Sequence, residues 1–72
     1  MERLPKLYIV VPCYNEEEAL PLTVPVFRKK LTDLSGRIAP DSRLVLVDDG
    51  SSDATWELIR SYHEQDERVL GI

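Results

Sequence analysis

The stretch Leu44-Val45-Leu46-Val47-Asp48-Asp49-Gly50-Ser51-Ser52-Asp53 decides the fold of this chain. Four consecutive apolar residues ended by an acidic pair and a glycine are typical of a strand that is buried on both faces. Ser52 or Asp53 can then begin a helix, which we expect to run to about Glu64. The stretch therefore predicts a strand, a short polar loop and a helix in succession.

The same order of signals occurs before this stretch. Residues 7–11 are a second apolar run, again read as a strand buried on both faces, and Pro12 stops it. Asn15 is a good helix N-cap, and Glu18 completes a capping box. Two prolines conflict with one smooth helix, so we expect a short first turn, a break or kink, and a helix over residues 22–34.

The apolar residues of both helices predict the faces that enter the core. The first helix carries a stripe at helical spacing, made of Leu22, Val26, Phe27, Leu31 and Leu34. The second helix carries a similar stripe, made of Trp56, Ile59, Tyr62 and His63. Residues 69–72 begin a third strand-like run.

The expected fold is α/β, a β-α-β-α-β Rossmann-like parallel sheet with right-handed crossovers. In the simple strand order 3-2-1, these crossovers place both helices on one face of the sheet. The other face is then a bare apolar surface, and such a surface needs a partner. We therefore expect the 72 residues to be the first part of a larger domain, and to self-associate through the uncovered face when alone.

Composition excludes several classes of protein. The 72 residues carry a net charge of −4, which argues against a surface that follows nucleic-acid phosphates and against a polybasic membrane patch. Hydrophobic residues make up 43% and charged residues 31%, which is typical of a folding chain. The single cysteine, Cys13, excludes an internal disulfide and fits a reducing compartment.

Two polar clusters follow the first two predicted strands, Pro12-Cys13-Tyr14-Asn15-Glu16 and Asp48-Asp49-Gly50-Ser51-Ser52-Asp53. Ligands of open α/β sheets bind outside the carboxyl ends of the strands, so the two clusters should form one cleft. A carboxylate there can accept N–H groups from a uracil or guanine edge or hold a cation, and a tyrosine offers a flat face to a base. The cleft suits the base and ribose of a nucleotide better than its phosphates.

At these clusters the sequence resembles the start of a family 2 glycosyltransferase. The resemblance rests on Val10-Val11-Pro12-Cys13-Tyr14-Asn15-Glu16-Glu17 and on residues 44–55, in this order and spacing. The Tyr-Asn-Glu-Glu sequence most resembles the polyprenyl-phosphate or dolichol-phosphate sugar transferases. The resemblance implies that residues 1–72 are the N-terminal, nucleotide-sugar-binding portion of an incomplete GT-A domain.

The resemblance also implies roles for individual residues. It assigns no catalytic or metal-ligating residue to this chain, and it places five residues at the nucleotide: Pro12, Tyr14, Glu16, Val47 and Asp49. It implies that Asp48, Gly50 and Ser51 support the loop. In the complete enzyme the donor is a UDP- or GDP-sugar, and Mg²⁺ or Mn²⁺ binds to ligands that lie mostly outside these residues.

The acceptor implied by the resemblance is a polyprenyl phosphate or a glycan, and nucleic acid is not a partner. The implied location is the cytoplasm, with the cytoplasmic membrane face as the alternative for the complete protein. Competing interpretations stay open: a non-catalytic truncated fragment, or a receiver-like signalling domain that binds Mg²⁺. A dinucleotide-binding half-domain fits less well, since no Gly-x-Gly-x-x-Gly follows the first strand.

Each site residue also has a plain structural interpretation. The aspartates are common turn formers and helix caps, and the glutamates favour the first turn of a helix. Tyr14 could be a packed loop residue. Cys13 needs an activating base to act as a nucleophile, and the single histidine, His63, lies on a distant helix.

Overall fold

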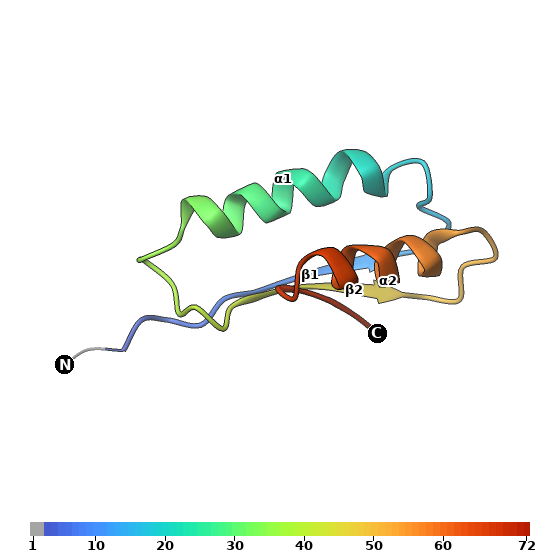
Figure 1. The fold of residues 1–72 in the computed structure, drawn as a ribbon. Coiled ribbons are helices and arrows are strands. Elements are labelled where there is room, and N and C mark those ends of the chain that lie inside the picture. Colours follow the sequence, from blue (N-terminus) through green and yellow to red (C-terminus); the bar gives the residue numbers. More distant parts are fainter. Residues whose placement is uncertain (1–2) are drawn as a thin grey trace.

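The computed structural model describes residues 3–72 and has the predicted alternation of strands and helices (Figure 1). The elements are β1 (Tyr8–Cys13), α1 (Leu20–Asp33), β2 (Arg43–Asp48), α2 (Thr55–Gln65) and β3 (Val69–Gly71). The strands form one sheet in the order β1-β2-β3, and both pairings are parallel. The α/β class and the parallel sheet are therefore confirmed. Within residues 3–72 no helix has the length and apolar character needed to cross a bilayer.

Strand β1 continues through Pro12 to Cys13, so the prediction that Pro12 stops it is wrong. Leu7 and Cys13 both accept hydrogen bonds from the β2 side, which places the odd-numbered residues of β1 in the ladder. Pro12 is an even-numbered residue of an edge strand, so its nitrogen faces the open edge of the sheet. A proline there removes no hydrogen bond from the β1–β2 ladder.

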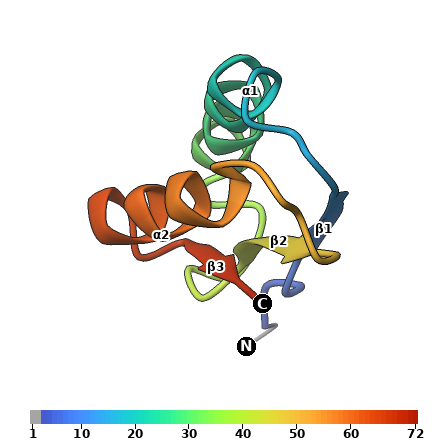
Figure 2. The same ribbon diagram turned by 90° about the vertical axis from the view of Figure 1, so that its right-hand side faces the viewer.

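Both helices lie on the same face of the sheet, as predicted (Figure 2). The strand residues under them are fully buried, namely Cys13, Leu44, Leu46 and Val69. On the opposite face, Tyr8 is 50% and Val10 is 59% exposed, so β1 is not buried on both faces as expected. We call the surface of Tyr8, Val10, Pro12, Val45, Val47 and Leu70 the open sheet face.

Helix α1 begins at Leu20 and is continuous to Asp33, without the predicted break. Its N-cap is Ala19, and no side chain caps it, so the capping box of Asn15 and Glu18 is not formed. Pro21 falls in the first turn, where backbone N–H groups have no partner within the helix in any case. Pro25 lies inside the helix and removes one helical hydrogen bond. Packing of the buried face of α1 against the core offsets this loss.

The buried stripe of α1 also differs from the prediction. Leu20, Val24 and Leu31 are buried, whereas Leu22 is 75% and Val26 is 65% exposed. Two residues along a helix correspond to a rotation of about 200°, so starting at Leu20 places Leu22 on the outer side. Of the predicted stripe, Leu31 is buried, and Phe27 and Leu34 are half-buried.

Helix α2 matches its prediction more closely. Ile59 is fully buried and Tyr62 packs against the core, but Trp56 is 38% exposed and His63 is exposed. The His63 ring Nδ1 lies 2.6 Å from the Val69 carbonyl oxygen. The stripe therefore holds α2 against β3, with Trp56 at its margin.

Ionic contacts join α1 to the turn before β3. The Asp66 carboxylate accepts hydrogen bonds from Arg68 Nη2 at 2.8 Å and from Arg28 Nε at 3.2 Å. Arg68 Nη1 also donates to Thr32 Oγ1 at 3.2 Å. Hydrogen bonds from Arg68 hold the pKa of Asp66 at about 2, below its usual value near 3.8. The charged form of Asp66 is therefore the form that stabilises the fold.

We expect Asp66→Asn to lower the free energy of unfolding by about 1–2 kcal/mol at pH 7, because the charged acceptor is lost while the amide oxygen stays. A lowered pKa gives stability that is present above about pH 4 and is lost as the pH falls through about 2. The difference between the two proteins should therefore shrink over this range in urea unfolding followed by Trp56 fluorescence. A difference that stays constant between pH 4 and pH 2 would contradict the assignment. Asp33→Asn, which breaks only an exposed pair with Lys29, is the control.

The open sheet face predicts that the chain self-associates. We expect a mass above that of the monomer in sedimentation, and binding of a hydrophobic dye, because exposed apolar patches of this kind favour association. Val10→Glu should lower both, since it places a charge at the centre of the face. Val26→Glu makes the same change on the outer side of α1 and should lower neither. A native chain that is a monomer, melts cooperatively and binds no dye would refute this expectation.

Candidate functional site

The parallel register brings the two predicted polar clusters together. Pro12 pairs with Val47 and Cys13 pairs with Asp48, so β1 and β2 end at the same level. The Asp49 backbone N–H then donates to the Cys13 carbonyl at 2.9 Å, one residue beyond the ladder. The β1–α1 loop (residues 14–19) and the β2–α2 loop (residues 49–54) therefore start side by side, as Figure 1 shows.

The five predicted nucleotide-binding residues all lie at these two strand ends. Pro12 and Val47 are cross-strand partners and share the open sheet face. Tyr14 follows β1 directly and is 60% exposed, and Asp49 follows β2 directly and is also exposed. Glu16 is half-buried. The two strand ends together present an aromatic ring, a carboxylate and two apolar side chains.

Three consecutive amides of the β1–α1 loop are bonded to side-chain oxygens of the neighbouring segment. Asn15 N–H donates to Ser51 Oγ at 2.9 Å, and Glu16 N–H donates to Thr55 Oγ1 at 2.8 Å. Glu17 N–H donates to Asp53 Oδ2 at 3.3 Å. Successive free amides can form an anion site. Here side chains already fill that role, so these amides are not available to a phosphate.

Asp53 and Thr55 hold the start of α2. Asp53 Oδ1 accepts the Thr55 backbone N–H at 2.9 Å and also the Thr55 hydroxyl. These bonds to Thr55, with the bond from Glu17, lower the pKa of Asp53. Thr55 is fully buried. Asp53 therefore serves as a loop and helix-start residue, one of the two interpretations given above.

The two acidic residues at the end of β2, Asp48 and Asp49, lie in different environments. Asp48 Oδ1 accepts the Ser51 N–H at 3.0 Å, which closes a turn through Gly50 at a φ of +75°. That φ favours glycine, so Gly50 permits the turn. Asp49 is exposed, and no hydrogen bond or ion pair of its carboxylate is formed with residues 3–72. Asp49 is thus the member of the pair that can meet a ligand.

Cys13 does not have the environment of a nucleophile. It is 1% exposed, and its thiol lies 3.5 Å from the Val11 carbonyl. Burial raises the pKa of Cys13, and the nearby charges of Glu16 and Asp48 raise it further. His63 contacts the Val69 carbonyl on the α2 side instead. Cysteine–histidine catalysis therefore has no support in this structure.

Neither loop carries a lysine or an arginine. Asp48 at the end of β2 adds a sixth carboxylate to the five that the loops hold: Glu16, Glu17, Glu18, Asp49 and Asp53. In the part of the chain that the structure describes, no three metal-ligating side chains converge on one point. A diphosphate placed here therefore needs positive charge from outside these residues.

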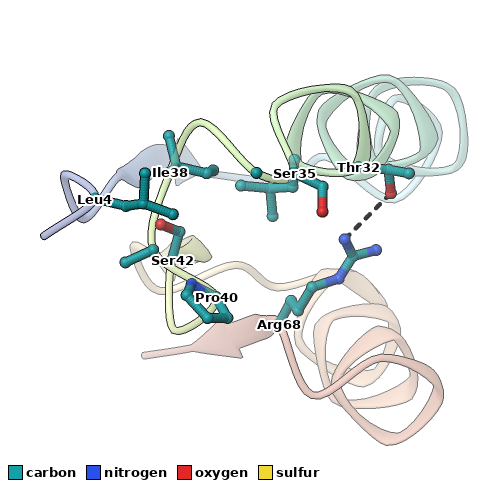
Figure 3. Close-up of a pocket in the computed structure, with 10 residues that line it drawn as sticks. Leu4, Thr32, Ser35, Ile38, Pro40, Ser42 and Arg68 are labelled. Atoms are coloured by element: carbon teal, nitrogen blue, oxygen red, sulfur yellow. Dashed lines mark hydrogen bonds between the residues drawn. The ribbon is translucent and has the colours of Figure 1, made fainter. Parts of the chain in front are cut away.

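A cavity of about 340 Å³ lies at the other end of the sheet, before β2 and β3 (Figure 3). Leu4, Ile38 and Pro40 line it, and the guanidinium of Arg68 points from one wall toward Thr32. Its polar groups are already paired, because Arg68 is bonded to Asp66 and Thr32. The cavity is therefore separate from the predicted nucleotide site.

Two structural residues of the site were not singled out from the sequence. Asn15 was interpreted as a helix cap, but its Oδ1 accepts the Ser52 N–H at 2.9 Å. Thr55 was not assigned any role, yet it joins the two loops. The residue types of both are a sequence signal for such bonds, since short hydroxyl and amide side chains readily form hydrogen bonds with nearby backbone groups. Their partners lie across the sheet, and a sequence pattern does not name them.

Comparison with known proteins agrees with this geometry. A family model described as "Glycosyl transferase family 2" matches residues 8–72. The uncharacterized glycosyltransferase YkoT of Bacillus subtilis (strain 168) is 43% identical over 70 residues, which cover 94% of this chain and 21% of that protein. No solved structure gives a significant match.

Two further relatives are named undecaprenyl-phosphate 4-deoxy-4-formamido-L-arabinose transferase. The one from Photorhabdus laumondii is 38% identical over 69 residues, covering 96% of this chain and 20% of that protein. The one from Salmonella choleraesuis is 32% identical over 68 residues, covering 93% and 20%. The chain spans about one fifth of the length of these curated relatives. The predicted resemblance, including its polyprenyl-phosphate branch, is confirmed, and the chain belongs to glycosyltransferase family 2.

Proposed function

We propose that this chain forms the donor-nucleotide part of a glycosyltransferase, and that it binds the base and ribose of a UDP- or GDP-sugar. The observation that carries the proposal is the fixed pairing of the two loops. In this pairing Tyr14 and Asp49 are both exposed, and each directly follows one of two neighbouring strands. The other acidic residues with bonded carboxylates, Asp48 and Asp53, are occupied within the loops. Of the carboxylates in these loops without a hydrogen bond to residues 3–72, that of Asp49 lies directly at a strand end, where open α/β sheets bind ligands.

Asp49 favours a base that carries a ring N–H. A carboxylate only accepts hydrogen bonds, and uracil and guanine each present a ring N–H on their pairing edge. Cytosine presents a ring nitrogen acceptor at the same position, which a carboxylate repels. Tyr14 offers a flat face for the base, while Pro12 and Val47 supply an apolar surface beside it. We therefore expect uracil or guanine nucleotides to bind in preference to cytosine nucleotides.

The diphosphate requires a cation that these residues do not hold alone. The amides of the β1–α1 loop are occupied, and the surrounding carboxylates repel phosphate. We propose that Mg²⁺ or Mn²⁺ offsets this charge in the complete enzyme, with ligands mostly outside the 72 residues. The described residues do not form a metal site by themselves.

The sugar acceptor that we propose is a polyprenyl phosphate, with a glycan as the alternative. Support comes from the names of two relatives, which specify undecaprenyl phosphate. We place the complete protein in the cytoplasm, at the cytoplasmic face of the membrane, where a lipid phosphate is within reach. The reduced, buried Cys13 is compatible with that compartment.

Nucleotide titration followed by amide NMR tests the proposal. UDP or GDP should shift the amide signals of residues 13–16 and 47–51, and CDP should bind more weakly. Asp49→Ala should weaken UDP or GDP binding at least about tenfold, because a hydrogen bond to a charged acceptor contributes about 1.5–3 kcal/mol. Asp33→Ala removes the same charge from the far end of α1 and should leave the affinity unchanged.

Two outcomes would count against this function. A folded chain whose signals do not respond to UDP or GDP has no nucleotide site at these loops. Binding that is equally strong after Asp49→Ala would place the nucleotide elsewhere.

A further inference from the structure

We propose that Asn15 is a positioning residue of the nucleotide site, and that it acts by joining the two loops rather than by touching the nucleotide. This inference rests on the function proposed above. Asn15 makes what we call the inter-loop bridge: its backbone N–H donates to Ser51 Oγ, and its Oδ1 accepts from Ser52. The contacts are 2.9 Å each, and the Ser52 hydroxyl adds a third at 3.4 Å.

The bridge joins the two segments that carry the exposed ligand groups. Asn15 follows Tyr14 directly, and Ser51 and Ser52 lie two and three residues after Asp49. The bridged residues are exposed or half-buried, so packing alone does not hold these segments in place. Together with the Asp49–Cys13 backbone bond, the bridge sets the position of the Tyr14 segment relative to the Asp49 segment. A site that is already ordered loses less entropy when it binds a ligand.

The backbone of Asn15 explains why this residue type serves. Its φ is +49°, and it is the only non-glycine residue with a positive φ among residues 3–72. Asparagine, aspartate and glycine accept this conformation more readily than other residues. Glycine has no side-chain acceptor, and aspartate adds a charge to a loop pair that already holds five carboxylates. Asparagine supplies the conformation and the acceptor without that charge.

Three variants separate positioning from a purely structural role. Asn15→Gly keeps the positive φ and removes the Oδ1 acceptor, whereas Asn15→Asp keeps both. Ser51→Ala removes the other half of the bridge from the opposite loop, without changing the Asn15 side chain. Ser35→Ala, just beyond the C-terminal end of α1 and away from the two loops, is the matched control.

The first measurement uses the free protein. Hydrogen exchange of the Ser52 amide should be at least about tenfold faster in Asn15→Gly than in the native chain, because this amide loses its acceptor. Asn15→Asp should restore most of the protection. Equal exchange rates in the native chain and Asn15→Gly would show that the bridge does not form, whether or not a nucleotide binds.

The second measurement is a double-mutant cycle on UDP or GDP affinity, measured on chains shown to be folded. Asn15→Gly and Ser51→Ala should each weaken binding about threefold to tenfold, because each removes a different hydrogen bond of the bridge, and the double variant should bind more weakly than either one. Ser35→Ala should bind like the native chain, and Asn15→Asp should retain most of the affinity in 1 M salt, where its added charge is screened.

The remaining outcomes have distinct meanings. Weaker binding in Asn15→Gly with native affinity in Ser51→Ala would overturn the inference and indicate that Asn15 contacts the nucleotide itself. Unchanged affinity in Asn15→Gly would make its role structural only. A native chain that binds neither UDP nor GDP while Ser52 stays protected would overturn the proposed function, and the positioning role with it, and would leave the bridge as a structural feature.

Discussion

The parallel pairing of β1 with β2 is the constraint on which both the fold and the site depend. Because Cys13 pairs with Asp48, the two strands end at the same level, and the Asp49–Cys13 hydrogen bond extends the pairing into the loops. Asn15 and Ser51, which are 36 residues apart in the sequence, then meet as neighbours. A shift of the register by one residue would turn every strand side chain to the other face and separate these loops.

Hydrogen bonding within the loops divides their acidic residues by role. Asp48 closes the turn through Gly50. Asp53 accepts one hydrogen bond from the first backbone N–H of α2 and one from an amide of the opposite loop. These bonds hold both carboxylates against the loop backbone, Asp48 by one bond and Asp53 by three when that from the Thr55 hydroxyl is included. Asp49 differs because the strand ends just before it and its side chain stays in solvent. Two adjacent aspartates therefore serve opposite purposes, one inside the loop and one outside it.

From the sequence, the elements and their order were predicted well, whereas the buried face of α1 was predicted poorly, for physical reasons. The run Leu44-Val45-Leu46-Val47 and the acidic turn after it are local signals, and they locate β2 correctly. Leu20 and Leu22 are chemically equivalent, and only packing on the sheet decides which of them is buried. Pro12 was read as a stop because the edge position of β1 is not visible in a single sequence. The cap at Asn15 was wrong because its partner, Ser52, lies on another loop.

The one-sided arrangement of the helices connects the uncovered surface to the site. Val10 and Val45 form the middle of the open sheet face, and Pro12 and Val47 continue the same face to the carboxyl ends of the strands. The apolar surface next to Asp49 is thus the last part of the open sheet face rather than a separate patch. Any protein segment that covers Val10 also approaches the position proposed for the base. The same contact would therefore both cover the sheet and shape the proposed nucleotide site.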